Sequence, residues 1–445
     1  MSAASPEARE RLGAVQELRE PISRATPASL WRRRDFMLLW SGQTVAELGS
    51  AVAPFALPFL AVTALRATPF DVGVLTALGT VPFLLIALPA GVIVDRVVRR
   101  RLMMWCNVGR AVVIGIVPVT YWLGHVTLVQ LYAVALATGV LTVFFDVAYQ
   151  SYLPTLLNRD QLVDGNGKTG TTQSAAQMLG LPMAGGMVSL AGAARSVLVD
   201  AGSFLVSAVS LALIRTPEPA QAARGDRPAF RAQMVEGLGF VVGHPILRKI
   251  VACTSTSLFF GSMTTALEMV FLVRYLSVQP GTAGLITACA GLGGAVGGVI
   301  GGRLGRLVGT SRIIWLSILG AGWTGLLIPL AQPGWGVLLF GLGYFGMYFS
   351  AVVYNIAQIS YRQAICPPAL LGRMNASVRW IAWGTIPLGA LAGGSLATWI
   401  GVRETLWIAG AGVWAAGLLV FCSPLRGRRD VEIQMCAESP DEHQL

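Results

Sequence analysis

The stretch IIWLSILGAGWTGLLIPLAQPGWGVLLFGLGYFGMYFSAVVYNIAQISY, residues 313–361, contains no aspartate, glutamate, lysine or arginine. A helix that crosses a membrane needs about 20 mainly apolar residues. The stretch is long enough for two such helices, and the turn-forming run Gln332-Pro333-Gly334-Trp335 lies between them. It therefore predicts two consecutive membrane-spanning helices.

The rest of the chain continues this pattern. Residues 111–145 and 275–302 are also free of acidic and basic side chains. Of all residues, 54% are hydrophobic and 12% are charged, whereas soluble domains carry roughly 25% charged residues. So few charges cannot solvate the surface of a soluble globular protein of this length. The composition therefore predicts an all-α membrane protein.

The apolar runs predict twelve transmembrane helices, arranged as two pseudo-symmetric six-helix bundles. The expected spans are residues 37–62, 70–94, 103–123, 127–152, 170–192, 196–214, 248–272, 281–302, 312–331, 335–360, 377–399 and 404–423. The first 30 residues are polar and hold three prolines, so we expect a flexible tail rather than a signal peptide.

The distribution of basic residues predicts the orientation. Cytoplasmic loops of membrane proteins are enriched in lysine and arginine. With the twelve spans above, 27 basic residues fall on the side of the two termini and 4 on the other side. We therefore expect a multi-pass protein of the plasma membrane with both termini in the cytoplasm. The net charge of +11 then reflects topology and not nucleic-acid binding.

These spans divide the chain into five parts. We expect a cytoplasmic tail at residues 1–34, a first bundle at 35–215, a linker at 216–247, a second bundle at 248–424 and a cytoplasmic tail at 425–445. Within the linker, Phe230, Met234, Leu238 and Val241 recur at helical spacing, which predicts an amphipathic surface helix. A plain tether and a regulatory segment both fit this linker.

A repeated loop supports the two halves. The sequence Gly91-Val-Ile-Val-Asp95-Arg96-Val-Val-Arg99-Arg100-Arg101 follows the second span, and Gly298-Val-Ile-Gly-Gly302-Arg303-Leu-Gly-Arg306 follows the eighth. The glycine, valine, isoleucine and two arginines match at an offset of 207 residues. Transporters are often built from such repeats, with the substrate site between them.

The loop Gly91-x-x-x-Asp95-Arg96-x-x-Arg99-Arg100 resembles the signature loop of the major facilitator superfamily. The resemblance covers about residues 35–425. Segments such as Phe145–Pro154, Asp200–Ala208, Glu236–Arg248 and Arg379–Gly394 are similar to the drug-efflux branch that includes macrolide and siderophore exporters.

The resemblance implies alternating access between the two bundles. It also implies that Asp95 faces the N-terminal end of the eleventh helix, where a carboxylate meets the positive end of the helix dipole. Arg379 lies near that end and is positioned to pair with Asp95. The arginines Arg96, Arg99 and Arg100 have a second interpretation, as anchors on the cytoplasmic side.

Exporters of this superfamily often carry Gly-Pro-x-x-Gly-Gly in the fifth helix. Here the run is Gly180-Leu-Pro182-Met-Ala-Gly185-Gly186, with a leucine between the glycine and the proline, and Pro387 stands at the related place in the eleventh helix. Prolines and small residues favour a kinked, closely packed gating helix, although packing alone also explains them.

Three carboxylates stand inside predicted spans, where a charged group is costly and usually faces a cavity or a partner. Glu47 lies near the middle of the first span, Asp146 in the fourth and Glu268 in the seventh. We expect Glu47 to exchange the coupling proton, with a structural hydrogen bond as the alternative. Asp146 has a structural alternative as well, pairing with Arg110 of the third helix, and Glu268 fits an interfacial position.

The sequence predicts no enzyme, no cofactor and no metal site. Its six cysteines and three histidines lack metal-site spacing, and no catalytic motif is present. We therefore expect a monomeric secondary transporter that exports an amphipathic small molecule, such as an antibiotic, in exchange for protons. Import of a metabolite on the same fold is the alternative, followed by a membrane sensor and a membrane-embedded enzyme.

Overall fold

The computed structural model describes residues 30–94, 96–157, 159–218, 230–367 and 370–427. Within these ranges the secondary structure is helical. The elements are η1 (Leu30–Arg32), α2 (Arg34–Gly49), α3 (Val52–Thr63), α4 (Pro69–Leu85), α5 (Ala87–Val94), α6 (Arg99–Trp122), α7 (Leu128–Leu156), α8 (Arg159–Ala191), α9 (Ala193–Ala212), α10 (Phe230–Gly243), α11 (Pro245–Val270), η2 (Phe271–Tyr275), α12 (Pro280–Val308), α13 (Thr310–Ala321), η3 (Gly322–Leu327), η4 (Gly334–Gly336), α14 (Val337–Ile365), α15 (Leu371–Ile400), α16 (Val402–Phe421) and η5 (Pro424–Gly427).

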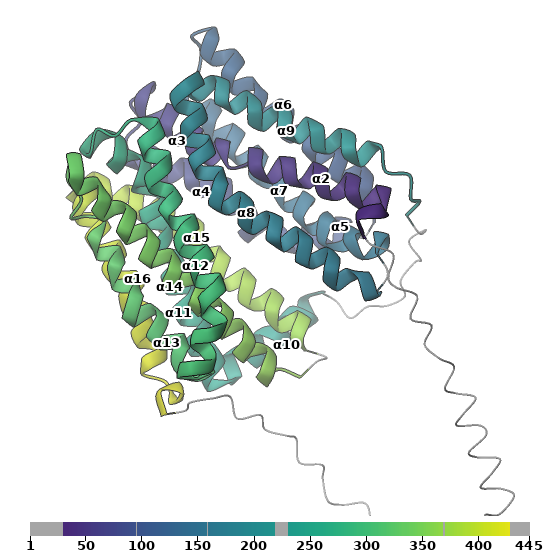
Figure 1. Ribbon diagram of the computed structural model, residues 1–445, viewed down its shortest axis with the longest axis vertical. Helices are drawn as coiled ribbons and strands as arrows, with labels where there is room; N and C mark the ends of the chain where they lie inside the picture. The colour runs from purple at the N-terminus through teal and green to yellow at the C-terminus, as the bar shows by residue number, and fades with distance from the viewer. Residues whose placement is uncertain (1–29, 95, 158, 219–229, 368–369, 428–445) are drawn as a thin grey trace, which may run out of the picture.

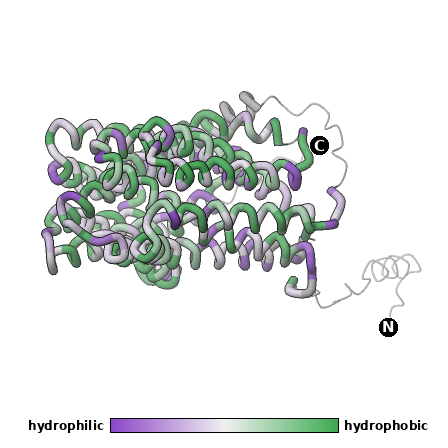
Figure 2. Tube along the Cα trace, turned by 90° about the horizontal axis from the view of Figure 1, so that it is seen from above, coloured by the Kyte–Doolittle hydropathy of each residue, from purple (hydrophilic) through white to green (hydrophobic). Residues whose placement is uncertain are grey.

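These elements form twelve spans. Eight segments of the described chain are long and apolar enough to cross a membrane: α2 with α3, α6, α7, α9, α11 with η2, α12, α14 with η4, and α16. The pairs α4–α5 and α13–η3 and the more polar helices α8 and α15 complete the twelve. Figure 2 shows hydrophobic residues along most of the length of the helices. The predicted all-α fold of two six-helix bundles is confirmed.

Three spans predicted as single helices are interrupted. The first breaks at Ser50, between α2 and α3. The second breaks at Ile86, between α4 and α5. The ninth changes from α13 to the 3₁₀ helix η3 in the run 320–325, where three glycines disfavour the α-helix.

Other helices are longer than the predicted spans. The fifth was expected at 170–192, but α8 begins at Arg159, and the eleventh was expected at 377–399, but α15 begins at Leu371. The apolar runs indicate only the part of a helix that contacts lipid, whereas a helix continues into water with polar residues. The linker contains the described helix α10, which packs against α11 and α15.

The chain enters α2 and leaves α16 on one side of the bundle, here named the terminal side; the other is the opposite side. In Figure 1 the purple-to-teal helices α2–α9 and the green-to-yellow helices α11–α16 form two bodies that meet along α8, α12, α4 and α15. Near the opposite side, α8 crosses α12 at Gly185 and Gly284, and α4 crosses α15 at Gly73 and Gly394. A Cβ atom on Gly185 would stand 2.5 Å from Cα of Gly284, so only glycine permits this approach.

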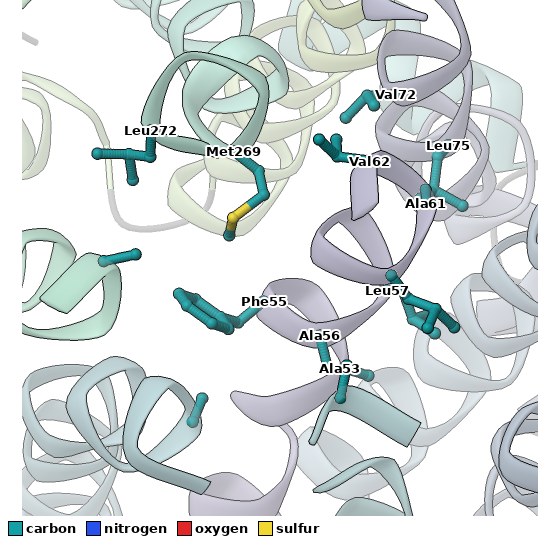
Figure 3. Packing of buried hydrophobic residues seen from close by; sticks show 14 of the residues in the cluster. Ala53, Phe55, Ala56, Leu57, Ala61, Val62, Val72, Leu75, Met269 and Leu272 are labelled. Atoms are coloured by element: carbon teal, nitrogen blue, oxygen red, sulfur yellow. The ribbon is translucent and has the colours of Figure 1, made fainter. Parts of the chain in front are cut away.

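Apolar packing also joins the two bodies on the opposite side. One core cluster holds residues of both, including Phe55 and Val62 of α3 with Met269 and Leu272 of α11 and η2. Figure 3 shows Phe55 and Met269 pointing toward one another. Toward the terminal side, the buried clusters of the described residues belong to one body each. The seam between the bodies is therefore closed on the opposite side.

Candidate functional site

A cavity of about 330 Å³ lies between the bodies, toward the terminal side. Helices α2, α7 and α8 of the first body and α15 of the second supply its walls. The lining residues are Trp40, Gln43, Thr44, Glu47, Asp146, Tyr149, Gln150, Asn166, Thr169, Gly170, Thr172, Gln173, Arg379 and Trp383. The long helices α8 and α15, which are not apolar enough to span a membrane by composition, thus face the cavity. This position explains why their sequences carry polar residues inside the membrane.

Opposite charges face the cavity from the two bodies. Glu47 of α2 and Asp146 of α7 lie on the side of the first body, and Arg379 of α15 lies on the side of the second. Asp146 interacts electrostatically with Glu47 and with Arg379. The guanidinium of Arg379 stacks 4.2 Å from the ring centroid of Trp383. Two of the three predicted acids and Arg379 therefore share one site.

The cavity combines aromatic rings with polar groups. Trp40, Tyr149 and Trp383 contribute rings. The Nε1 of Trp40 and the Oε1 of Gln43 are buried and have no hydrogen-bond partner among the described residues. Buried polar atoms are normally satisfied, so these two are suited to bond a ligand. Gln43 also donates from Nε2 to Oε1 of Glu47 at 2.9 Å, which orients that carboxylate.

Arg110 of α6 lies deep in the first body, behind the cavity. Its guanidinium sits between the rings of Phe145 (4.5 Å) and Phe204 (4.2 Å) and donates to Oδ1 of Asn107. Asn107 in turn donates to Oγ of Ser207 at 2.9 Å. No ion pair within 4 Å joins Arg110 to Asp146 in the described part of the chain, but the two interact electrostatically. In place of the ion pair with Asp146, Arg110 thus stacks on two aromatic rings and donates to the side-chain amide of Asn107.

A fourth intramembrane carboxylate, Asp200 of α9, was not among the predicted site residues. It is 1% exposed, and neither of its oxygens meets hydrogen-bond geometry with a described residue. Arg110 is the cation that acts on it electrostatically. The sequence did carry the signal, an aspartate between apolar residues 196–214, but the spacing along the chain did not relate it to Arg110, which lies three spans earlier.

Glu268 of α11 does not line this cavity. It lies in the second body, where Tyr344 of α14 donates a hydrogen bond to its Oε2 at 2.8 Å. Tyr344 stacks in turn on Phe340, with ring centroids 4.6 Å apart. In this conformation, Glu268 is separate from the pair formed by Glu47 and Asp146.

The signature loop lies on the terminal side. Asp95 lies outside the described residues, so its expected contact with the eleventh helix stays a prediction. Arg99 donates to the carbonyl of Ser151 at 3.2 Å, and Arg100 donates to the carbonyl of Ile214. These arginines therefore tie the ends of α7 and α9 to α6. Gly91 lies in α5 with open space at its Cβ position, and Arg96 is exposed.

The glycines and prolines of the predicted gating helices lie at or near the seam. Pro182 lies within α8 and Pro387 within α15, and both helices continue through them. Gly180 faces Ala51, at the break in the first span, and Gly185 faces Gly284. Gly186 has no atom within 4 Å of its Cβ position. Close packing is therefore a property of Gly180 and Gly185 and not of the whole run.

A family model described as "Transmembrane secretion effector" matches residues 25–443. The chain belongs to this family of the major facilitator superfamily. Membership makes the chain a multi-pass membrane transporter, and the sequence resemblance to drug-efflux members is confirmed.

Curated relatives of this secretion effector family member include efflux proteins. The multidrug efflux pump Tap of Mycolicibacterium fortuitum is 25% identical over 395 residues, which cover 84% of this chain and 92% of Tap. Macrolide efflux protein A of Streptococcus pyogenes is 21% identical over 404 residues, 91% of this chain and 98% of that protein.

Solved structures share the fold. The nucleoside transporter NupG superposes with a TM-score of 0.69 at 11% identity, covering 87% of this chain and 98% of NupG. A bacterial homologue of the iron transporter ferroportin in an inward-facing state superposes with a TM-score of 0.68 at 14% identity. The superposition covers 88% of this chain and 98% of that homologue. These likenesses establish architecture only, because the identities are low.

Proposed function

We propose that this transporter exports an amphipathic small molecule across the plasma membrane in exchange for protons. The observation that carries the proposal is the cavity on the terminal side, where aromatic rings, unsatisfied polar atoms and two carboxylates lie together. The excess of basic residues on the terminal side supports placing that side in the cytoplasm. The cavity is then loaded from inside the cell. The efflux relatives support the same direction.

Glu47 is the proposed coupling carboxyl. It lines the cavity, and Gln43 holds its Oε1. In the proposed cycle, the ionised carboxylate is present when substrate enters from the cytoplasm. When the cavity faces outward, a proton binds the carboxylate and substrate leaves. The protonated form then returns, and the proton is released inside. Each proton that enters down a potential of 100 mV gains about 2.3 kcal/mol, which drives the exchange.

Arg379 has a proposed role in the outward-going step, in which the loaded cavity closes on the terminal side. It stands across the cavity from Asp146 and Glu47 when the terminal side is open. Closing that side brings α15 toward the first body, so the attraction between these charges favours closure. The contact of Asp95 with the start of α15, implied by the family resemblance, belongs to the same closed state.

Transport in proteoliposomes tests direction and coupling together. We expect a labelled macrolide to accumulate in vesicles when the pH gradient is imposed in the export sense, and not when it is reversed. Glu47→Gln should abolish accumulation driven by the gradient but retain exchange of labelled for unlabelled macrolide, because exchange requires no net proton movement. Glu404→Gln, on the opposite side at the start of α16, is the matched control.

The outcomes separate the hypotheses. Undiminished gradient-driven accumulation in Glu47→Gln removes Glu47 from coupling. Accumulation only with the reversed gradient indicates import. If no gradient in either sense moves the macrolide, although it binds the purified protein, the proton is not the coupling ion.

A further inference from the structure

A second cavity lies outside the transport pathway, between the first turns of α6 and the last turn of α9. Its volume is about 380 Å³. Two consecutive arginines and four apolar residues line it: Arg100, Arg101, Met104, Trp105, Leu211 and Ala212. None of these residues lines the substrate cavity.

This groove opens toward lipid. On α6, Trp105 is 64% exposed and Val112 is 58% exposed. Val209 in the last turn of α9 and Leu213 directly after it are also exposed. Large apolar side chains on the outer face of a membrane-spanning bundle contact acyl chains. The occupant of the groove therefore comes from the bilayer.

The depth of the groove matches the interface between head groups and acyl chains. Arg101 is the third residue of α6, and Trp105 lies four residues later on the same face. At about 1.5 Å per residue, the Cα atom of Trp105 lies about 6 Å deeper in the membrane than the Cα atom of Arg101. Arginine at the head-group level and tryptophan just beneath it is the usual order at a membrane surface.

The charges of the groove leave one guanidinium free. The carboxylate of Glu218 accepts from the backbone N–H groups of Arg99 and Arg100, at 3.0 and 2.6 Å, and so neutralises the first turn of α6. The side chain of Arg100 donates to the carbonyl of Ile214. Arg101 is exposed and forms no ion pair among the described residues.

We propose that this groove binds an anionic phospholipid of the cytoplasmic leaflet. Its phosphate lies at Arg101 beside Arg100, and one acyl chain runs along Met104, Trp105 and Leu211. Basic pockets between helices at the cytoplasmic surface suit such head groups. Since Arg100 holds the end of α9, a lipid here reinforces the junction of α6 with α9 and the linker that follows.

Quenching of tryptophan fluorescence tests the proposal. The protein is reconstituted with phosphatidylglycerol or phosphatidylcholine that carries bromine on an acyl chain near the head group. The signal of Trp105 is obtained as the difference between the full chain and its Trp105→Phe variant. We expect stronger quenching by the brominated phosphatidylglycerol. Arg101→Gln should reduce this preference about fivefold, and Arg101→Lys should retain most of it.

Arg306→Gln is the matched control, since it removes a basic residue on the terminal side of the other body. Equal quenching by both lipids overturns the proposal, as does an unchanged preference in Arg101→Gln. If Arg306→Gln loses the lipid preference to the same extent, the preference depends on net charge alone, and the proposal is also overturned. Loss of the preference on adding inorganic phosphate assigns the groove to a soluble anion instead.

Discussion

Arg110 shows how a single buried cation organises the first body. It is 5% exposed and acts electrostatically on Asp146, Asp200 and Glu47. We expect Arg110→Leu to destabilise the protein by about 3 kcal/mol, because it leaves buried carboxylates without their cation. Thermal unfolding in detergent measures this loss. Asp200→Asn should restore part of the stability in the double variant, and a double variant no more stable than Arg110→Leu contradicts the assignment.

His244 caps α11 just outside the membrane. Its Nδ1 accepts from the N–H groups of Ile246 and Leu247, both at 3.3 Å, and burial lowers the pKa of the ring from its usual 6.5. The protonated ring cannot accept. Stability from the cap is therefore present above the pKa of the unfolded chain and is lost as pH falls through the lower pKa of the folded protein.

Removing the cap at His244 should change how the stability depends on pH. We expect His244→Ala to lower the stability by about 1 kcal/mol near pH 8. The difference should be smaller at pH 5, because the cap is lost as the ring becomes protonated at falling pH. Thermal unfolding at the two pH values checks this. His244→Asp keeps an ionised cap and should show a smaller pH effect. An equal difference in stability between the native protein and His244→Ala at both pH values shows that the ring does not act as a cap.

At the scale of elements, the crossing of α8 and α12 holds the opposite side closed. We expect Gly185→Ala to open this seam and slow transport about fivefold, because a methyl group against Gly284 overpacks the contact. Gly186→Ala is the matched control, since its Cβ meets open space. With native cysteines replaced, labelling of Ala283→Cys from outside the cell measures the opening. Equal labelling in both glycine variants refutes this role.

The sequence predicted elements better than it predicted contacts. The twelve spans follow from charge-free runs, because a lipid-facing helix has to be apolar. Glu47 and Asp146 were found because a carboxylate there is costly. By contrast, the hydrogen bond between Asn107 and Ser207 depends on how α6 packs on α9, so it could not be predicted from the residue types. Glu268 was expected at an interfacial position of the seventh span, but its place in the sequence did not show that its side chain turns toward Tyr344.

At the scale of the whole molecule, few polar contacts cross the seam. Nη2 of Arg274, in η2, donates to the carbonyl of Ala67 in the first body at 2.6 Å. Arg403 makes a similar bond to the carbonyl of Ala331, but within the second body, at 3.0 Å. Only the first of these bonds must break when the opposite side opens.

The two arginines therefore provide a matched test of alternating access. We expect Arg274→Gln to raise the population open on the opposite side about fivefold, since a charge-assisted hydrogen bond across the seam is lost. Arg403→Gln should leave that population unchanged. Distances between spin labels on the two bodies measure the population. An equal shift in both variants shows a general loss of packing, and no shift in Arg274→Gln removes its bond from the gate.

The polarity of α8 and α15 has a consequence for biogenesis. Both helices line the cavity, and neither is among the segments apolar enough to span a membrane by composition. The translocon releases segments into lipid according to their apolarity. We expect these two helices to be retained at the translocon until the following hydrophobic helix, α9 or α16, leaves the ribosome and packs against them. The residues that let the protein bind its substrate thus also fix the order in which its spans enter the bilayer.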